Sequence, residues 1–524
     1  MTAHWQAGWR AQLPALFARE WDVLIVGGGI TGAGILLEAA RRGLKALLVE
    51  QRDFAWGTSS RSSKLVHGGL RYLKEGQLGL MRESVHAREA LLREAPGLVQ
   101  EQSFAFGDYA GRKPGRASFL VGLAIYDLMA GRRERHYVGA DAFCMLAPNV
   151  RRAGLRGGIR YTDAKTDDAR LVLRVLQEAQ AHGGVAVNYM AVKSLLRAGG
   201  KVCGAQLGDG SAVRARLVIN ATGAWADALR AQSGAAPRLR PLRGSHLVLP
   251  AWRLPLSQAI SLMHPADGRP VFAFPWEGVT LVGTTDVDHA GGMAQEAAIT
   301  HAELDYLMDA LRFQFPQQAL MEADIIATYA GVRAVIASGD GDPSKAARDH
   351  AVWVDDGLLT VTGGKLTTFG AIALDALRHA RALLPGWHDD LAARALFAAP
   401  PAVAPRARLK GAALARLLGR HGAHTPALIA AARDGELEAI AGTETLWAEL
   451  RWAARCEAVL RLEDLLLRRT RLGLQLRGGG AAVMARIRAT CQGELGWSDP
   501  RWDAEVAAYL ALWKTHYSLP TAPA

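Results

Sequence analysis

Apolar runs of strand length alternate with a helix-like segment near the start of the chain. Residues 22–26 (DVLIV) form one continuous apolar run, which is typical of a buried parallel strand. A helix-like segment follows from Ile30 to Arg42, and the apolar run KALLV leads to Glu50. This order predicts a βαβ unit, in which two parallel strands flank a helix.

The pattern changes further along the chain. Residues 167–184 have apolar positions at helical spacing, which predicts an amphipathic helix. Residues 241–335 contain several strand-like runs, which predict an antiparallel sheet. The proline-rich stretch 398–405 (AAPPAVAP) predicts a linker, and helical sequence rich in Ala, Leu and Arg follows it.

These patterns predict an α/β protein with an added all-α domain. We expect a Rossmann-like domain that binds a dinucleotide, an antiparallel β-sheet substrate domain interleaved with it, and a C-terminal helical domain. The expected boundaries are an N-terminal extension (1–20), dinucleotide-binding parts (about 21–80, 150–235 and 340–385), substrate-domain parts (about 81–149 and 236–339), a linker (398–405) and a helical domain (406–524).

Composition narrows the class of protein. A chain of 524 residues is long enough for two or three domains. The longest apolar runs fall short of the roughly 18 residues that span a bilayer, and we expect no secretory signal. Four scattered cysteines predict neither a disulfide framework nor a metal site. The net charge of +12 is compatible with nucleic acid, an anionic membrane or anionic substrates as partners.

The turn after the first strand carries a dinucleotide-binding fingerprint. Gly27, Gly29 and Gly32 are in G-x-G-x-x-G register, and Glu50 ends the second strand. Glycines at these positions permit a tight turn, close approach of the backbone to a pyrophosphate, and close packing of helix and strand. Glu50 can accept hydrogen bonds from a ribose. The chain has only one such fingerprint, which favours a flavoprotein with a single dinucleotide.

Eight motifs together resemble one family. They are GGGITGAG, TSSRSSKLVHGGLRYL (58–73), DDARLV (167–172), INATGAWAD (219–227), RGSH (243–246), GTTDV (283–287), YAGVR (329–333) and GGKLTT (363–368). In this order they resemble FAD-dependent glycerol-3-phosphate dehydrogenase, the respiratory, quinone-linked enzyme of the amino-acid-oxidase-like flavoprotein superfamily. The tail with EDLLLRRTRLGL (463–474) resembles the C-terminal helical domain of that family.

The resemblance implies noncovalently bound FAD and a set of residues that contact it. The serine-rich loop and the pair Gly68-Gly69 are expected beside the flavin ring, where a side chain would collide with it. The implied cofactor-binding residues are Gly27, Gly29, Ile30, Thr31, Gly32, Glu50, Thr58, Ser59, Ser62, Ser63, Lys64, His67, Gly68, Gly69, Ala221, Thr222, Gly223, Gly364, Lys365, Leu366 and Thr367.

The resemblance also implies the substrate site. Arg71 and Tyr72 would face the substrate, with Arg71 on its phosphate. His246, Arg333 and Lys365 are the implied catalytic residues: His246 is the base, and the two cations bind the anionic substrate. The sequence lacks the proline that the family pattern would place after Arg333, so the loop 334–345 is expected to differ.

The implied reaction is oxidation of sn-glycerol 3-phosphate to dihydroxyacetone phosphate, with electrons passing to a membrane quinone. Alternatives with the same fold are an oxygen-using glycerol-phosphate oxidase and an amine or amino-acid oxidase. A flavin-dependent nucleic-acid modifier is an alternative of another class. It lacks a clustered basic tract, so nucleic acid is not an expected partner. Self-association, for example as a homodimer, is a further expectation.

A quinone-linked enzyme without a spanning segment has to meet the membrane at its surface. We therefore expect a cytoplasmic protein that is peripheral on the inner face of the cell membrane. Trp5, Trp9, Leu13 and Leu16 recur at helical spacing in the N-terminal extension and form one candidate contact. Packing of this stripe on the protein itself is the alternative, and Pro14 opposes a continuous helix there.

Overall fold

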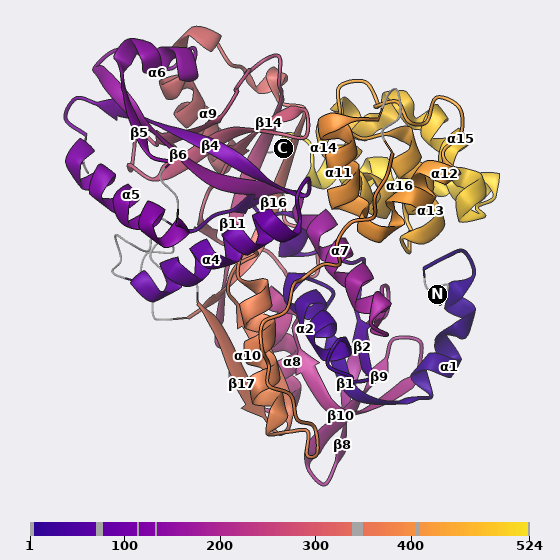
Figure 1. The fold of residues 1–524 in the computed structure, drawn as a ribbon. Coiled ribbons are helices and arrows are strands. Elements are labelled where there is room, and N and C mark those ends of the chain that lie inside the picture. The colour runs from indigo at the N-terminus through magenta and orange to yellow at the C-terminus, as the bar shows by residue number, and fades with distance from the viewer. Residues whose placement is uncertain are drawn as a thin grey trace.

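The structure is a computed structural model that describes residues 5–69, 77–112, 115–131, 134–337, 349–404 and 409–521. Two β-sheets and a separate group of helices make up the fold, and Figure 1 shows this last group at the upper right, in orange to yellow. The predicted fold class is confirmed: a parallel-sheet domain, a largely antiparallel second sheet and a C-terminal helical domain.

The first sheet contains the fingerprint strand. Among the described residues its strands are β1 (Glu20–Val26), β2 (Ala46–Val49), β7 (Val185–Val187), β8 (Val192–Ala198), β9 (Lys201–Leu207), β10 (Ala212–Asn220), β17 (His350–Asp355) and β18 (Leu358–Gly363). The order is β17-β18-β10-β1-β2-β7, and the hairpin β8–β9 joins it at β10. β1 lies parallel to both β2 and β10. The predicted βαβ unit is therefore present.

Helices cover this sheet. They are α2 (Ile30–Ala40), α7 (Asp168–Ala181), α8 (Ala226–Arg230) and α10 (Phe369–Arg381). α7 begins where the Asp167 carboxylate accepts a hydrogen bond from the backbone N–H of Arg170, which caps the helix. A methyl group on Gly34 of α2 would lie 3.0 Å from the ring of Phe369, so α2 and α10 pack closely at this glycine.

The second sheet comes from several separate parts of the chain. Its described strands are β3 (Leu65–Val66), β4 (Val99–Tyr109), β5 (His136–Gly139), β6 (Leu155–Thr166), β11 (Leu239–Pro250), β12 (Ala259–Met263), β13 (Pro270–Trp276), β14 (Val279–Gly283), β15 (Val287–Asp288) and β16 (Ala327–Ile336). The described strand pairs are antiparallel except β4 with β12. We expected 155–166 in the dinucleotide-binding part, but these residues pair with β4 as β6 of this sheet.

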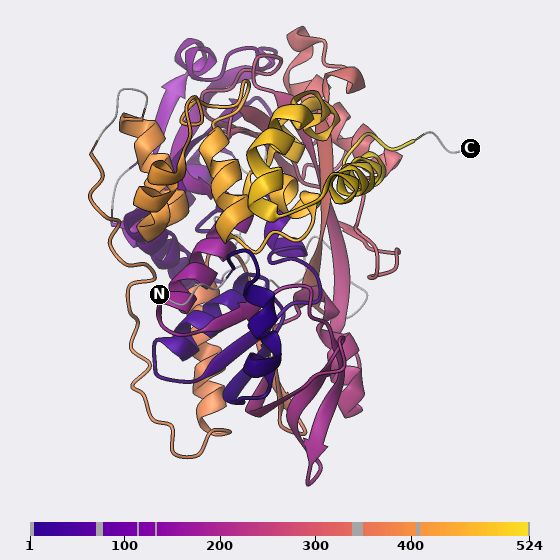
Figure 2. The same cartoon turned by 90° about the vertical axis from the view of Figure 1, so that its right-hand side faces the viewer.

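Among the described residues, four helices accompany the second sheet: α4 (Leu78–Glu94), α5 (Arg116–Ala130), α6 (Ala140–Leu146) and α9 (His301–Gln314). An irregular segment (382–404) then leads to the C-terminal domain, and Figure 2 shows it running along the outside of the molecule. That domain contains α11 (Gly411–His421), α12 (Thr425–Ala431), α13 (Trp447–Cys456), a π-helical segment (Asp464–Arg469), α14 (Leu472–Gln475), α15 (Met484–Leu495) and α16 (Asp499–His516).

The N-terminal stripe is not a membrane contact, because its side chains are buried in the protein itself. Trp5, Trp9, Leu13 and Leu16 are each at most 6% exposed. The indole N–H of Trp5 donates to the carbonyl of Ala186 over 3.0 Å. The expected helix is also short, since a 3₁₀ turn precedes α1 (Leu13–Phe17), with Pro14 in the first turn of α1, where proline is tolerated. In the described part of the chain, no helix combines the length and apolar character that crossing a bilayer requires.

Candidate functional site

The first and third fingerprint glycines are each needed for a close contact. Gly27 has φ +116°, and a Cβ there would lie 2.5 Å from the carbonyl oxygen of Ala221. A Cβ on Gly32 would lie 1.9 Å from the carbonyl oxygen of Gly27, which forbids any side chain. The turn between β1 and α2 therefore lies against the end of β10. As the fingerprint predicts, the first and third glycines permit a tight turn and close packing.

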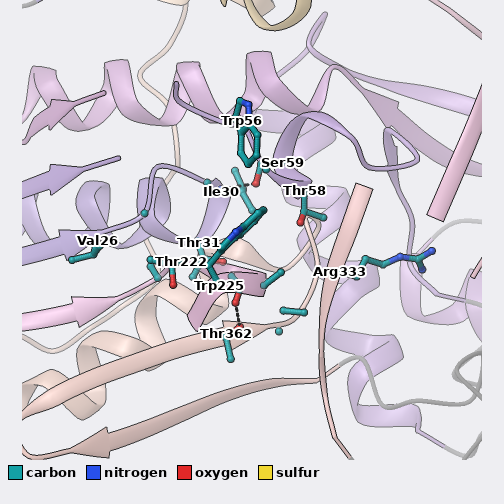
Figure 3. Close-up of a pocket in the computed structure, with 18 of the residues that line it drawn as sticks. Val26, Ile30, Thr31, Trp56, Thr58, Ser59, Thr222, Trp225, Arg333 and Thr362 are labelled. Carbon is teal, nitrogen blue, oxygen red and sulfur yellow. Dashed lines mark hydrogen bonds between the residues drawn. The ribbon is translucent and has the colours of Figure 1, made fainter. Parts of the chain in front are cut away.

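A cavity of about 330 Å³ opens at this turn, beside the N-terminus of α2. Figure 3 shows Ile30, Thr31, Thr222 and Trp225 around it. The predicted cofactor-binding residues that line the cavity are Gly27, Gly29, Ile30, Thr31, Glu50, Thr58, Ser59, Ser62, Ala221, Thr222, Gly223, Gly364, Lys365 and Leu366. Segments that are far apart in the sequence thus form one lining. The remaining predicted residues, Gly32, Ser63, Lys64, His67, Gly68, Gly69 and Thr367, are not part of it.

Glu50 lines the cavity, but its carboxylate also organises the fingerprint turn. One oxygen accepts a hydrogen bond from the backbone N–H of Gly28 over 2.7 Å, and the other accepts from the N–H of Arg52 over 2.8 Å. Burial raises the pKa of the Glu50 carboxyl, and these two donors oppose that shift. A carboxylate has about four acceptor sites, so the predicted contact with a ribose is compatible with both bonds.

Residues 58–64 (TSSRSSK), which we call the serine loop, follow the fingerprint unit. The hydroxyl of Ser59 accepts a hydrogen bond from the backbone N–H of Ile30 over 2.9 Å, at the start of α2. Lys64 was a predicted cofactor contact, but its ammonium is fully buried and lies 3.0 Å from the carboxylate of Asp168. Burial lowers the pKa of Lys64 to about 8. The contacts of Lys64 are therefore with the protein, because a buried cation needs a paired anion.

The glycine pair that follows has a protein contact of its own. The backbone N–H of Gly68 donates to the hydroxyl of Tyr126 and to Asp163, each over 3.0 Å. A Cβ on Gly68 would lie 2.3 Å from that hydroxyl oxygen. Tyr126 thus explains the glycine without a flavin. The predicted substrate residues Arg71 and Tyr72 lie outside the described residues.

His246 lies deep in the second sheet, next to the serine loop. Its ring is 2% exposed and stacks on Tyr329 of β16, with centroids 4.6 Å apart. Nε2 of His246 lies 2.9 Å from the hydroxyl oxygen of Ser63. Nδ1 is buried and has no hydrogen-bond partner within the described ranges. Burial and the charges of Lys64 and Arg333 hold the pKa of His246 well below its ordinary 6.5, so the imidazole is neutral near pH 7.

The register of the second sheet places Arg333 on the same face as His246. In the pairing of β11 with β16, His246 is opposite Tyr329 and Leu242 is opposite Arg333, so Tyr329 and Arg333, four positions apart, point to one face. Arg333 passes over Gly244, where a Cβ would lie 2.4 Å from its Nη2. Arg333 donates to the carbonyl of Thr285 over 3.1 Å and also lines the cavity. Figure 3 shows its guanidinium directed away from the fingerprint end.

Lys365 is the other predicted substrate-site cation that lies within the described residues. It follows β18 at the Gly363–Gly364 turn and lines the cavity. Its ammonium lies 2.8 Å from the hydroxyl of Ser84 on α4, so it bridges the two sheet domains. Gly364 has φ +74°, a backbone conformation that favours glycine. The structure therefore brings Arg333 and Lys365 to the cavity of the fingerprint, and places His246 behind the serine loop.

Two tryptophans of the site did not appear among the predicted residues. Trp56 and Trp225 line the cavity, and their rings lie 5.7 Å apart. Their indole N–H groups donate to Glu296 over 2.8 Å and to the carbonyl of Met293 over 2.7 Å. Trp225 belongs to the motif INATGAWAD, so its position two residues after Gly223 was a usable signal. Val192 and Gln232, which also line the cavity, lack any such signal in the sequence.

The residues at the cavity fit an FAD molecule. The N-terminus of α2 directs backbone N–H groups toward it, which suits a pyrophosphate. Gly223 has φ +60°, and a Cβ there would meet no protein atom within 4 Å, so the backbone is open to a ligand. Apolar side chains such as Val192 and Leu229 stand beside these polar groups. This mixture of donors and apolar walls is typical of a dinucleotide site.

Comparisons with known proteins identify the family of both parts of the chain. Residues 22–374 match the family described as FAD dependent oxidoreductase, and residues 382–502 match the family described as the C-terminal domain of alpha-glycerophosphate oxidase. A glycerol-3-phosphate dehydrogenase of Mycobacterium leprae is 37% identical over 519 residues, which cover 94% of this chain and 88% of that protein.

Solved structures extend the comparison. The glycerol-3-phosphate dehydrogenase from Bacillus halodurans, complexed with FAD, matches this structure with a TM-score of 0.77 and 25% sequence identity. The match covers 99% of this chain and 100% of the Bacillus chain. The L-alpha-glycerophosphate oxidase from Mycoplasma pneumoniae, with FAD bound, has a TM-score of 0.57 and 20% identity over 70% of this chain and 97% of its own, which shows a shared fold.

Proposed function

Since the chain belongs to the family of FAD-dependent glycerol-3-phosphate dehydrogenases, we propose that it oxidises sn-glycerol 3-phosphate to dihydroxyacetone phosphate and passes the electrons to a membrane quinone. One observation carries the proposal: two cationic residues, Arg333 and Lys365, line the same cavity as the fingerprint glycines. These two cations can bind the dianionic phosphate of a substrate held in the same cavity as the dinucleotide.

The cations suit an anionic substrate. The planar guanidinium of Arg333 can bind a phosphate through two hydrogen bonds, and the ammonium of Lys365 adds a compact charge. Arg333 already contacts Asp286 at 3.5 Å, which holds its side chain over Gly244. Arg71, if it acts as the resemblance implies, adds a third cation from outside the described residues. An amino-acid substrate, with a single carboxylate, would need fewer cations.

His246 is the base in this proposal. Its neutral imidazole can accept the proton of the C2 hydroxyl, and its Nδ1 has no hydrogen-bond partner in the described structure. Bound FAD would supply the acceptor for the hydride that leaves C2. The protein positions the alcohol, takes its proton and neutralises its phosphate, so that C2 becomes the carbonyl carbon of dihydroxyacetone phosphate.

The exposed face of α5 supports the choice of a membrane quinone over oxygen. Val121 is 62% exposed and Leu128 is 83% exposed, and a spacing of seven residues places them on one face of the helix. Figure 1 shows α5 at the left edge of the molecule. Basic residues occur in the sequence before this helix (Arg112 and Lys113), at its first position (Arg116) and after it (Arg132, Arg133 and Arg135). Exposed apolar side chains on a helix that has basic residues near it in the sequence suit the surface of an anionic bilayer.

The test is anaerobic reduction of the purified yellow protein. We expect sn-glycerol 3-phosphate to bleach the flavin absorbance, and glycerol and amino acids to leave it unchanged. Reoxidation by a short-chain quinone should be faster than reoxidation by oxygen in the same buffer. Bleaching by an amino acid, but not by the phosphate substrate, would contradict the proposed reaction. Faster reoxidation by oxygen than by the quinone would show that the protein acts as an oxidase and not as a dehydrogenase.

We also propose that FAD is bound noncovalently. In the described part of the chain, no cysteine or histidine lines the cavity, so none is placed for a covalent link to the flavin. Acid precipitation should therefore leave the yellow colour in the supernatant, and colour that stays with the precipitate would contradict noncovalent binding.

A further inference from the structure

The C-terminal helical domain reaches the serine loop through a buried arginine. Arg471 stands immediately before α14, is 1% exposed, and has φ +66°. Its guanidinium donates to the carbonyl oxygen of Ser60, within the serine loop, over 3.2 Å. It also donates to Asp167 over 2.9 Å and forms an ion pair with Asp168. One side chain of the helical domain thus contacts both the loop and the first turn of α7.

Asp168 extends this contact to the wall of the cavity. One of its oxygens accepts hydrogen bonds from Ser62, over 3.0 Å from the backbone N–H and 2.7 Å from the hydroxyl. Both oxygens lie within 3.2 Å of the Lys64 ammonium. Ser62 lines the cavity, and its neighbour Ser63 contacts His246. A single buried carboxylate therefore connects Arg471 to the residues on either side of Ser63.

A second contact reaches the same loop from the end of the chain. The guanidinium of Arg61 donates to the hydroxyl of Tyr517, which follows α16, over 3.0 Å. Arg61 is also paired with Glu296 at 2.8 Å. The serine loop is therefore bonded to the helical domain at Ser60, at Arg61 and, through Asp168, at Ser62 and Lys64.

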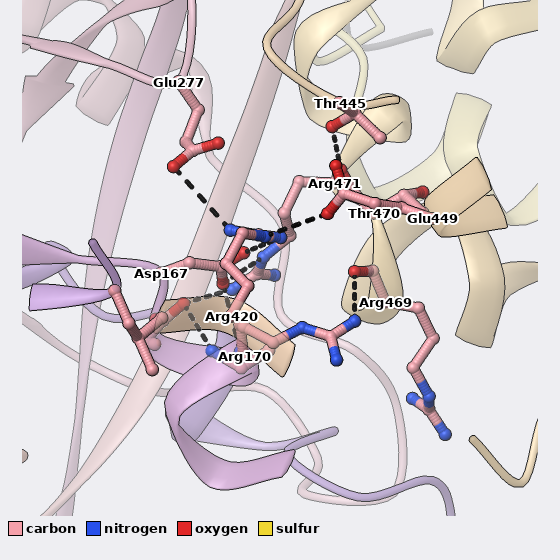
Figure 4. Close-up of polar contacts among 12 residues, drawn as sticks. Asp167, Arg170, Glu277, Arg420, Thr445, Glu449, Arg469, Thr470 and Arg471 are labelled. Carbon is pink, nitrogen blue, oxygen red and sulfur yellow. Dashed lines mark hydrogen bonds and ion pairs between the residues drawn. The ribbon is translucent and has the colours of Figure 1, made fainter. Parts of the chain in front are cut away.

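Further ion pairs surround Arg471, and Figure 4 shows several of them. Arg420 of α11 donates to Asp167 over 3.0 Å, and Arg170 of α7 binds Glu457 over 2.6 and 2.9 Å. Buried ion pairs are costly because both partners lose water, and they are weak evidence for stability. Their geometry is directional, however, so they restrict how the helical domain can be placed relative to the loop. Apolar packing alone would not impose that restriction.

We propose that the C-terminal helical domain positions the serine loop at the flavin cavity, with Arg471 as the positioning residue that acts through Asp168. Arg471 itself does not line the cavity. Its role is to hold Ser62 at the cavity wall and Ser63 at His246. The consequence for catalysis rests on the proposed function, whereas the placement of the loop does not.

The experiment is amide hydrogen exchange on the full-length protein, followed by mass spectrometry of a peptide covering the serine loop. Arg471→Met should make exchange in this peptide at least about tenfold faster, because a charge-assisted hydrogen bond is lost. Tyr517→Phe removes only a hydroxyl and should produce a smaller increase in the same peptide.

The matched control is Arg451→Met. Arg451 is 3% exposed, and its ion pairs with Glu436 and Glu494, each 2.5 Å, remain inside the helical domain. This variant should lower the melting temperature but leave exchange in the serine loop at the wild-type rate. If Arg471→Met and Arg451→Met change that exchange equally, the proposal is wrong.

Two further measurements separate the possible failures. If Arg471→Met does not fold, Asp168→Asn is the alternative variant, because it keeps the shape of the side chain and removes its charge. This variant should also increase exchange in the loop. Unchanged exchange in a folded Asp168→Asn protein would overturn the proposal. Flavin reduction by sn-glycerol 3-phosphate should slow at least about tenfold in Arg471→Met. A different outcome is that the substrate fails to reduce the flavin of the wild-type protein while Arg471→Met still makes exchange in the loop faster. That result would support the positioning role and refute only the proposed reaction.

Discussion

The hydroxyl oxygen of Ser63 lies 2.9 Å from Nε2 of His246, although the two residues are 183 positions apart in the chain. Ser63 belongs to the serine loop after the fingerprint unit, and His246 lies within β11. The contact joins the two sheet domains at the point where the base of the proposed reaction is needed. It also fixes the orientation of the imidazole ring, together with the stacked ring of Tyr329.

Ser63→Ala should lower turnover with sn-glycerol 3-phosphate by roughly tenfold, because one hydrogen bond contributes about 1 kcal/mol or somewhat more. FAD content should stay unchanged, because Ser63 does not line the cavity. His246→Asn should cause a larger loss. Adding Ser63→Ala to His246→Asn should have little further effect, since the serine acts through the histidine. Equal, additive losses would contradict this link.

Arg333→Ala should weaken use of the phosphate substrate while FAD stays bound. Loss of a charged hydrogen bond costs roughly 1.5–3 kcal/mol, which corresponds to about a tenfold to hundredfold rise in KM. Arg253→Ala is the matched control, because Arg253 is paired with Asp324 over 2.7 Å on the same domain and is not part of the cavity. Steady-state kinetics on both variants provide the measurement. A normal KM for Arg333→Ala would remove Arg333 from the substrate site.

The pH dependence of kcat/KM should report the environment of His246. Burial, followed by the charges of Lys64 and Arg333, lowers the pKa of His246 well below 6.5. The base is therefore already neutral at pH 6.5, and the acidic limb of the profile should lie below that value.

Lys64→Met supplies the control for this profile. Removing the positive charge of Lys64 favours the protonated imidazole, so the pKa of His246 should rise and the acidic limb should move to higher pH. An acidic limb that stays in place, in a variant that retains FAD, would show that Lys64 does not act on His246. A limb at lower pH would contradict the sign of the effect.

Val121→Asp combined with Leu128→Asp should reduce flotation of the full-length protein with anionic liposomes at low salt. A carboxylate on this face resists insertion between lipids and is repelled by anionic headgroups. Met321→Asp is the control, because Met321 is 60% exposed on a different segment. Both proteins should keep their flavin reduction by the phosphate substrate. Equal flotation of the two would exclude α5 as the membrane contact.

The sequence alone determined the features that depend on neighbouring residues. The strand, the glycine turn and the helix that starts at Ile30 are encoded within about thirty residues, because local periodicity and the conformational freedom of glycine decide them. The same holds for the helical character of the C-terminal domain. The motifs that contain Arg333 and Lys365 were identified through the family resemblance, and both residues line the cavity.

Only the tertiary structure decided which surfaces meet. The stripe of Trp5, Trp9, Leu13 and Leu16 has a spacing that suits a bilayer or a protein interior equally, and burial against the chain selects the interior. Lys64 stands in a motif for cofactor contact, yet Asp168, distant in sequence, binds its ammonium. The contacts of Arg471 with Asp167 and Asp168 join residues about 300 positions apart. Charge, spacing and apolar character specify what a side chain can bind, whereas its actual partner depends on long-range packing of the chain, which no local pattern encodes.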